Sequence, residues 1–327
     1  MLTIAALASA YRTRQTTPSA TLRDLLDRIA ASPLNSFISV DPETVMRQAA
    51  DADAAFAGGA PVGALHGIPV AVKDLIDVAG MRTTMGSQQY ANQASAERDA
   101  QVVARLRAEG AIIVGKTNTH EFAYGPTGDR SYFGAACNPR DPARMTGGSS
   151  SGSAAALGAG LCAAALGTDT SASIRLPAAL CGVVGLKPTY DLLPRAGAFD
   201  LSQTLDHVGP MSATVRDNAV LLDALAGQPA HSYARLAGQS VRGRTVGLAT
   251  GFYLDYLDAP VRQALAAGAA RYRMRQSRHR LDALLPGPAP RGPAGRRGAA
   301  LCQKPLARRV CVRLCLGRRL RAQRPAL

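Results

Sequence analysis

A change of composition at residue 271 limits how much of this 327-residue chain can build a core. Residues 271–327 hold 16 of the 38 Lys and Arg residues but only one of the 23 acidic residues, Asp282. The formal net charge of +15 therefore lies in this segment, and residues 1–270 are electrically neutral. Prolines interrupt the segment, and its apolar residues keep neither a helical nor a strand period. We expect the folded domain to occupy residues 1–270.

Three interpretations of residues 271–327 remain open. The sudden change into Arg, Pro, Gly, Ala and Cys after an uncapped helix pattern is what a GC-rich gene yields when it is translated in a shifted reading frame. We favour this interpretation over a genuine disordered extension. A basic arm that binds nucleic acid is the third interpretation. No basic or aromatic recognition pattern in residues 1–270 supports it, so we consider a nucleic-acid partner the weakest of the three.

Residues 1–270 alternate between helical and strand patterns. Helices are predicted within the N-terminal segment MLTIAALASAYRTRQ and over 22–31 (capped by Thr21), 42–57, 96–110, 150–160, 214–226 and 259–271. Strands are predicted over 35–40, 68–72, 111–115, 161–166, 183–186 and 245–248. This alternation is typical of an α/β domain whose sheet is largely covered by helices.

Cysteine usage and hydropathy indicate a reduced, cytoplasmic protein. None of the six cysteines forms a Cys-x-x-Cys pair, so no zinc or redox motif is indicated. No apolar run is long enough to cross a membrane. The first residues lack the basic region of a secretory signal and are read as an amphipathic helix.

Lysine is rare in this chain and stands at informative positions. There are four lysines against 34 arginines. Lys73 ends the apolar run 68–72, where burial could leave it neutral and able to act as a general base. The alternative is that Lys73 is a charged lysine with a structural role. The position of Lys73 after the apolar run, taken alone, favours this alternative.

Two serine-rich segments could bear a nucleophile. Residues 146–153 read TGGSSSGS and precede an Ala-rich helix. They match the bare Gly-x-Ser-x-Gly pattern, but no strand precedes them, so a nucleophile elbow is disfavoured. Residues 167–175 read GTDTSASIR and form a turn of small residues after an apolar strand. Such a turn can present a hydroxyl beside several free amides, the arrangement that an acyl-transfer oxyanion needs.

Taken together, these segments resemble the amidase signature family. PVAVKD, VGKTN, GGSSSGS, GTDTSASIR, CGVVGLKPT and HVGPM occur in the family's order across residues 60–212. The resemblance implies a single α/β domain with a mixed β-sheet covered by helices on both faces. It also implies hydrolysis of a carboxamide C–N bond through a Ser-cisSer-Lys triad and an acyl-enzyme.

Carried over by motif, Ser173 matches the nucleophile, Ser149 the bridging serine and Lys73 the base. The amides of Thr170, Ser171, Ala172 and Ser173 match the oxyanion hole, and Asp169 and Arg175 are expected to support the turn. The implied partner is a small-molecule amide, with no cofactor. A homodimer is compatible with the resemblance, as are partner subunits.

The chain departs from the family in two places. Residues 171–172 are Ser-Ala where the family commonly has Gly-Gly, so a positive φ at either position would be strained. Family members also continue well past the helix at 259–271, so we expect an incomplete fold that lacks its C-terminal part. The activity of such a chain is in doubt, and an exposed sheet edge would favour aggregation.

Three functions remain in competition. The first is an amide hydrolase of small molecules. The second, within the same family, is the glutaminase subunit of a tRNA-dependent amidotransferase. The third, from another class, is a nucleic-acid-binding protein with a basic tail, whose binding would depend strongly on salt.

Overall fold

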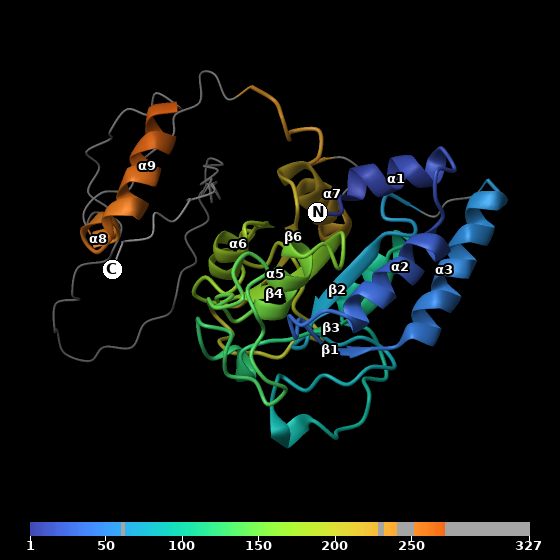
Figure 1. Cartoon of the computed structure of the whole chain (residues 1–327), viewed down its shortest axis with the longest axis horizontal. Coiled ribbons are helices and arrows are strands. Elements are labelled where there is room, and N and C mark those ends of the chain that lie inside the picture. The colour runs from blue at the N-terminus through green and yellow to red at the C-terminus, as the bar shows by residue number, and fades with distance from the viewer. Residues whose placement is uncertain (60–62, 228–231, 241–251, 272–327) are drawn as a thin grey trace, which may run out of the picture. The chain divides into compact units, whose positions relative to one another are not determined.

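The computed structural model describes residues 1–59, 63–227, 232–240 and 252–271 (Figure 1). Residues 1–239 belong to one compact unit, and the described residues from 240 onward belong to a second unit. The second unit contains α8 (Phe252–Asp255) and α9 (Ala259–Arg271), so the helix predicted over 259–271 is confirmed. The strand predicted over 245–248 and the basic segment after residue 271 lie outside the described residues.

Six strands form a mixed sheet in the first unit, in the order β1-β3-β2-β4-β6-β5. In chain order they are β1 (Phe37–Val40), β2 (Pro69–Lys73), β3 (Ile112–Thr117), β4 (Ala164–Asp169), β5 (Val184–Gly185) and β6 (His207–Ser212). β2 lies parallel between β3 and β4, and the other pairings are antiparallel. The expected mixed α/β sheet is confirmed. Because β2 and β4 are parallel, their carboxyl ends lie at the same end of the sheet.

Helices cover both faces of this sheet. The helices α1 (Ile4–Arg12), α4 (Gln101–Ala108) and α7 (Val215–Ala226) share one core cluster with Val70 and Val72 of β2. The helices α5 (Ser151–Gly158) and α6 (Arg175–Cys181) share another with Ala71. Because neighbouring residues of a strand point to opposite faces, the two clusters lie on opposite sides of β2.

Two further helices pack beside each other against β3. α2 (Pro18–Ala30) and α3 (Pro42–Ala57) bury Leu22, Leu25 and Val45 against Ile112 and Val114 of β3 (Figure 1). Two short 3₁₀ helices, η1 (Gln88–Tyr90) and η2 (Glu121–Ala123), lie in the connections on either side of α4 and β3.

Capping residues explain where the helices start. α3 begins at Pro42 as predicted, because the Asp41 side chain accepts a hydrogen bond from the Thr44 amide. The predicted start of α2 is wrong by four residues. Thr17, and not Thr21, caps this helix, and Pro18 follows it at the first helical position, where a missing N–H costs nothing.

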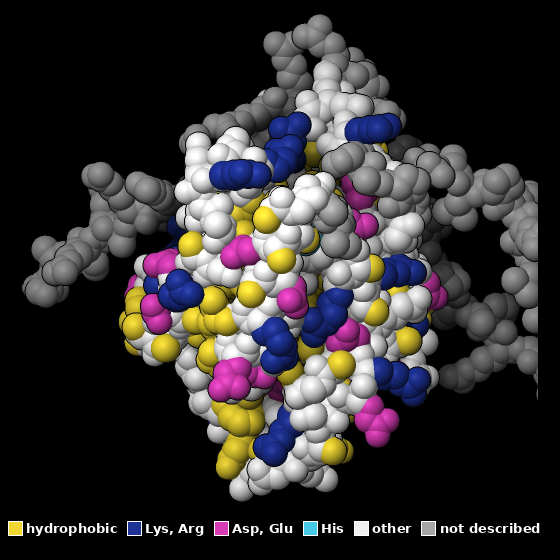
Figure 2. All heavy atoms as spheres, turned by 90° about the vertical axis from the view of Figure 1, so that its right-hand side faces the viewer, with side chains coloured by type: hydrophobic (Ala, Val, Ile, Leu, Met, Phe, Trp, Pro, Cys, Tyr) yellow, Lys and Arg dark blue, Asp and Glu magenta, His cyan; other side chains and the backbone are white. Residues whose placement is uncertain are grey.

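Charge is evenly mixed on the part of the molecule that can be seen in Figure 2. Basic and acidic side chains are interspersed over this face, without a separate basic area. The mixture agrees with the neutrality of residues 1–270. Among the described residues, no helix combines the length and apolar character that a membrane span needs.

Candidate active site

Lys73 is the last residue of β2, and its side chain is fully buried. Its Nζ donates hydrogen bonds to Ser149 Oγ at 2.7 Å and to Thr168 Oγ1 at 2.8 Å. Among the described residues, no carboxylate lies within ion-pair distance of this nitrogen. The sequence-predicted pair of Lys73 and Ser149 is therefore in direct contact.

The electrostatics of Lys73 suit a proton acceptor. Burial lowers the pKa of its ammonium from 10.5 to about 7, and the charges of Asp169 and Asp206 oppose the shift without cancelling it. A pKa near 7 leaves much of the side chain neutral at neutral pH. Hydroxyl partners permit this state, because a hydroxyl can donate to a neutral amine as well as accept from an ammonium.

Ser149 lies in the loop that precedes α5, and the Gly148–Ser149 peptide bond is cis. Its carbonyl accepts hydrogen bonds from the amide of His120 at 3.1 Å and from Thr119 Oγ1 at 3.0 Å. The next amide, that of Ser150, donates to the carbonyl of Ser173 at 3.1 Å. The two serine-bearing segments of the sequence are thus joined through their backbones.

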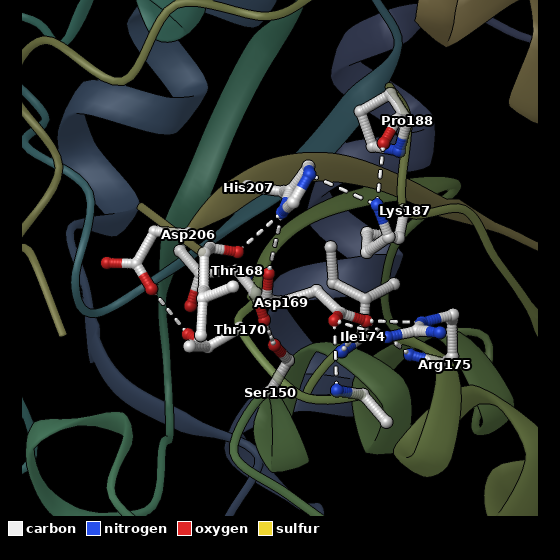
Figure 3. Close-up of polar contacts among 12 residues, drawn as sticks. Ser150, Thr168, Asp169, Thr170, Ile174, Arg175, Lys187, Pro188, Asp206 and His207 are labelled. Carbon is white, nitrogen blue, oxygen red and sulfur yellow. Dashed lines mark hydrogen bonds and ion pairs between the residues drawn. The ribbon is translucent and has the colours of Figure 1, made fainter. Parts of the chain in front are cut away.

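Asp169 organises the turn that bears Ser173 (Figure 3). Its carboxylate accepts hydrogen bonds from the amides of Ala172, Ile174 and Arg175. The Arg175 guanidinium binds both carboxylate oxygens, at 2.8 and 2.9 Å. Burial alone would raise the pKa of Asp169, but the hydrogen bonds and charge of Arg175 outweigh it and hold the pKa below its usual range.

The turn presents Ser173 at the edge of the buried region. Its side chain is 8% exposed, and its Oγ makes no hydrogen bond within the part of the chain that the structure describes. The amides of Ser171 and Ser173 likewise have no acceptor among the described residues. These groups are available to a ligand.

Ala172 differs from the other predicted oxyanion donors. Its amide donates to Asp169 Oδ1 at 2.9 Å and is thereby engaged within the turn. Its φ is +119°, a conformation that is strained for a residue with a side chain. This is the backbone geometry for which the family's glycine is suited.

A small cavity of about 10 Å³, about the room that one water molecule takes, lies beside this turn. Its lining includes Thr168 and Thr170 on the β4 side, Asp206 and His207 on the β6 side, and Phe199 from the preceding loop. Thr168 links the cavity to Lys73, since its hydroxyl accepts from Nζ.

Sequence reasoning missed several residues of this region. Thr168 belongs to the GTDTSASIR motif, and its place in that motif is the feature of the sequence that could have identified it. Asp206 accepts a hydrogen bond from the Thr170 hydroxyl at 2.5 Å. In the sequence, its position directly before HVGPM is the one feature that could have identified it. The described residues hold no group of three or more His, Cys, Asp or Glu that could bind a metal ion.

A second buried lysine lies one strand away. Lys116 of β3 forms an ion pair with Asp74 at 3.0 Å and also donates to Thr83 Oγ1 and the Arg82 carbonyl. Burial lowers its pKa, and Asp74 opposes the shift. With a carboxylate partner, Lys116 is suited to remain an ammonium, in contrast to Lys73.

Similar proteins were found by sequence and by structure. The chain is 41% identical over 284 residues to a glutamyl-tRNA(Gln) amidotransferase subunit of Geobacter sp. (strain M21), a match that covers 83% of this chain and 58% of that protein. The native peptide amidase of Stenotrophomonas maltophilia superposes with a TM-score of 0.72 at 34% identity, covering 83% of this chain and 60% of the other.

A third match has a TM-score of 0.81 at 32% identity and covers 84% of this chain and 63% of the other. It comes from a vestigial protein complex that reveals the evolutionary origins of an s-triazine catabolic enzyme. The chain thus spans less than two thirds of the length of these relatives. The Amidase family model matches residues 20–283, which include Lys73, Ser149 and Ser173, and the chain belongs to this family.

Proposed function

We propose that this protein hydrolyses the C–N bond of a carboxamide through an acyl-enzyme on Ser173. The observation that carries the proposal is the contact between buried Lys73 and Ser149, beside a turn in which the Ser173 hydroxyl and the amides of Ser171 and Ser173 are unengaged. A serine hydroxyl is a weak nucleophile and needs a proton acceptor, which a neutral lysine provides. The membership of the Amidase family supports the same reaction.

In the proposed first step, Ser173 Oγ attacks the substrate carbonyl carbon. The hydroxyl proton passes to Ser149 Oγ, and the Ser149 proton passes to neutral Lys73 Nζ. The carbonyl oxygen becomes an oxyanion, which the amides of Thr170, Ser171 and Ser173 stabilise. Ala172 shapes the turn, because its own amide is directed at Asp169.

The C–N bond then breaks. The leaving amine takes the proton back from Lys73 through Ser149, and the acyl group stays on Ser173 as an ester. Water attacks the ester carbonyl and gives its proton to the same Ser149–Lys73 relay. Release of the carboxylic acid restores the Ser173 hydroxyl and neutral Lys73.

A fluorophosphonate tests the assignment, because it phosphonylates an activated serine. We expect mass spectrometry of the labelled chain to find the adduct on Ser173. Labelling is expected to vanish in Ser173→Ala and to fall strongly in Ser149→Ala. Ser171→Ala is the matched control: it removes a hydroxyl from the same turn but leaves the amide. An adduct on another residue, or none on the wild type, contradicts the proposal.

A second candidate is the glutaminase subunit of a tRNA-dependent amidotransferase. Two curated relatives, 41% and 42% identical to this chain, are subunits of glutamyl-tRNA(Gln) amidotransferases. In this function the substrate is glutamine, and the released ammonia passes to partner subunits. Ammonia release from glutamine, compared with release from a panel of other primary amides, distinguishes the two candidates.

We further propose that the amidase domain occupies residues 1–270 and that residues 271–327 lie outside it, although the family match extends to residue 283. The neutrality of the first part and the location of all the quoted motifs within it support this division. A chain that ends at residue 270 should keep the fluorophosphonate labelling rate of the full chain. A loss of labelling in the shortened chain contradicts the division.

A further inference from the structure

His207 is placed against the turn of the candidate site, although the proposed mechanism gives it no role. It opens β6 and lies opposite Asp169 in the antiparallel pairing of β4 and β6. Its Nδ1 is 2.7 Å from the Leu205 carbonyl oxygen and 3.2 Å from the Asp169 carbonyl oxygen. Its Nε2 is 3.0 Å from Lys187 Nζ (Figure 3).

These contacts select one form of the imidazole. Carbonyl oxygens only accept hydrogen bonds, so Nδ1 carries the hydrogen. The Lys187 ammonium only donates, so Nε2 faces it with a lone pair. The ring of Tyr190 packs edge-on against the imidazole, with centroids 5.5 Å apart, and holds its plane. These contacts place the hydrogen of His207 on Nδ1 and a lone pair on Nε2.

The Nδ1–H is shared between the Leu205 carbonyl and, at the longer distance, the Asp169 carbonyl. The contact with Asp169 bears on the oxyanion site through peptide geometry. The carbonyl of Asp169 and the amide N–H of Thr170 belong to one planar peptide unit, so fixing the carbonyl also fixes the direction of the amide. A donor on the carbonyl oxygen polarises the unit and makes its N–H a stronger donor. The Thr170 side chain is held separately, because its hydroxyl binds Asp206.

We propose that His207 is a positioning residue that aims the Thr170 amide at the reaction oxyanion, with Lys187 selecting the tautomer required. The proposal rests on the proposed function, since the oxyanion forms only if Ser173 attacks a carbonyl.

Three substitutions separate positioning from general support of the fold. His207→Asn keeps an N–H donor near the place of Nδ1, His207→Gln puts its amide near the place of Nε2, and His207→Leu fills the space without a donor. The readout is the rate of fluorophosphonate labelling at Ser173 in the full chain, separated into the maximal rate and the half-saturating concentration. The phosphonyl oxygen occupies the same site as the reaction oxyanion.

We expect the maximal rate to fall about tenfold in His207→Gln and His207→Leu, less than the roughly 100-fold loss that follows removal of an oxyanion donor itself. The half-saturating concentration should stay within about twofold, and His207→Asn should keep most of the wild-type rate. Equal losses in all three variants, or none, overturn the proposal. A wild type that the reagent does not label refutes the proposed function and this inference with it, whereas a labelled wild type with an unaffected His207→Leu variant refutes the inference alone.

The tautomer can be measured without any activity. The chain has five histidines, and the His207→Asn variant identifies the signals of His207 in a spectrum of ¹⁵N-histidine-labelled protein. We expect the ¹⁵N shifts of a protonated Nδ1 and an unprotonated Nε2, and a partial change toward the other tautomer in Lys187→Met. A wild-type His207 that carries its hydrogen on Nε2 overturns the proposal.

Discussion

Lys73 Nζ and Ser149 Oγ are 2.7 Å apart in a fully buried setting where the second partner of the lysine is another hydroxyl. The neighbouring buried lysine, Lys116, instead faces the carboxylate of Asp74 at 3.0 Å. Two lysines on adjacent strands are thus buried in opposite electrostatic settings. The first is suited to exchange a proton, and the second to keep it.

The labelling rate of Ser173 should depend on the protonation of Lys73. Only neutral Lys73 accepts a proton, and burial sets its pKa at about 7. We therefore expect the rate to rise as pH increases through about 7 and to level off above it. Measuring the rate between pH 5.5 and pH 9 with a fluorophosphonate tests this. A rate that keeps rising toward the usual lysine pKa contradicts the burial argument.

Stability should also change with pH because of Lys73. Its pKa is lower in the folded state than in the unfolded chain, so the unfolded chain binds more protons between about 7 and 10.5. The free energy of unfolding contributed by this group therefore increases with pH across that window. Relative to Lys73→Met, the wild type should gain roughly 2–3 kcal/mol between pH 7.5 and pH 9.5, measured by urea unfolding. If the difference in unfolding free energy between the wild type and Lys73→Met does not change with pH, the lowered pKa of Lys73 is ruled out.

Lys116→Met is the matched comparison for Lys73→Met, and we expect it to lower the stability of the protein at neutral pH. It removes the cation of a buried ion pair and leaves the Asp74 carboxylate uncompensated. We expect a loss of about 3–5 kcal/mol in the free energy of unfolding. Adding Asp74→Asn to this variant should recover part of the loss. If Lys116→Met is as stable as the wild type, the two lysines do not differ as described.

Ala172→Gly should stabilise the protein. The alanine has a φ of +119°, where a side chain costs about 1–3 kcal/mol, and glycine removes that cost at a smaller expense in chain entropy. We expect a net gain of about 1 kcal/mol by thermal or chemical unfolding. Ala179→Gly, an exposed position inside α6, should instead lose about 1 kcal/mol.

Asp169→Asn should loosen the turn that bears Ser173. The variant loses the charge that pairs with Arg175 and weakens the hydrogen bonds to the amides of Ala172 and Ile174. We expect unfolding to become easier by about 3 kcal/mol and Ser173 labelling to slow. The difference from the wild type should shrink as pH falls through the lowered pKa of Asp169, because the wild type then loses the same charge. A difference that persists in acid would show that Asp169 acts by another means.

The sequence predicted the sheet type and the contact between Lys73 and Ser149 better than the details of the site. Amphipathic periods and caps located helices such as α3 and α9, because these signals are local. The strand β6 was missed, since Gly209 and Pro210 argue against a strand unless the neighbouring strands are known. The contacts of His207 depend on groups that meet across β4 and β6, which no local pattern reveals. The Ala172 amide is instead engaged within its own turn, by the side chain of Asp169.

The hydrogen bond between Lys73 and Ser149 joins residues 76 positions apart, and Lys73 ends β2, which lies between β3 and β4 in the sheet. Parallel pairings of this kind need long crossovers and complete late in the search for the native topology. In the proposed mechanism, reactivity at Ser173 is consequently a sensor of completed folding. In a mixed preparation, the fraction of chains that accept the label counts native molecules, independently of how much helix a spectrum reports.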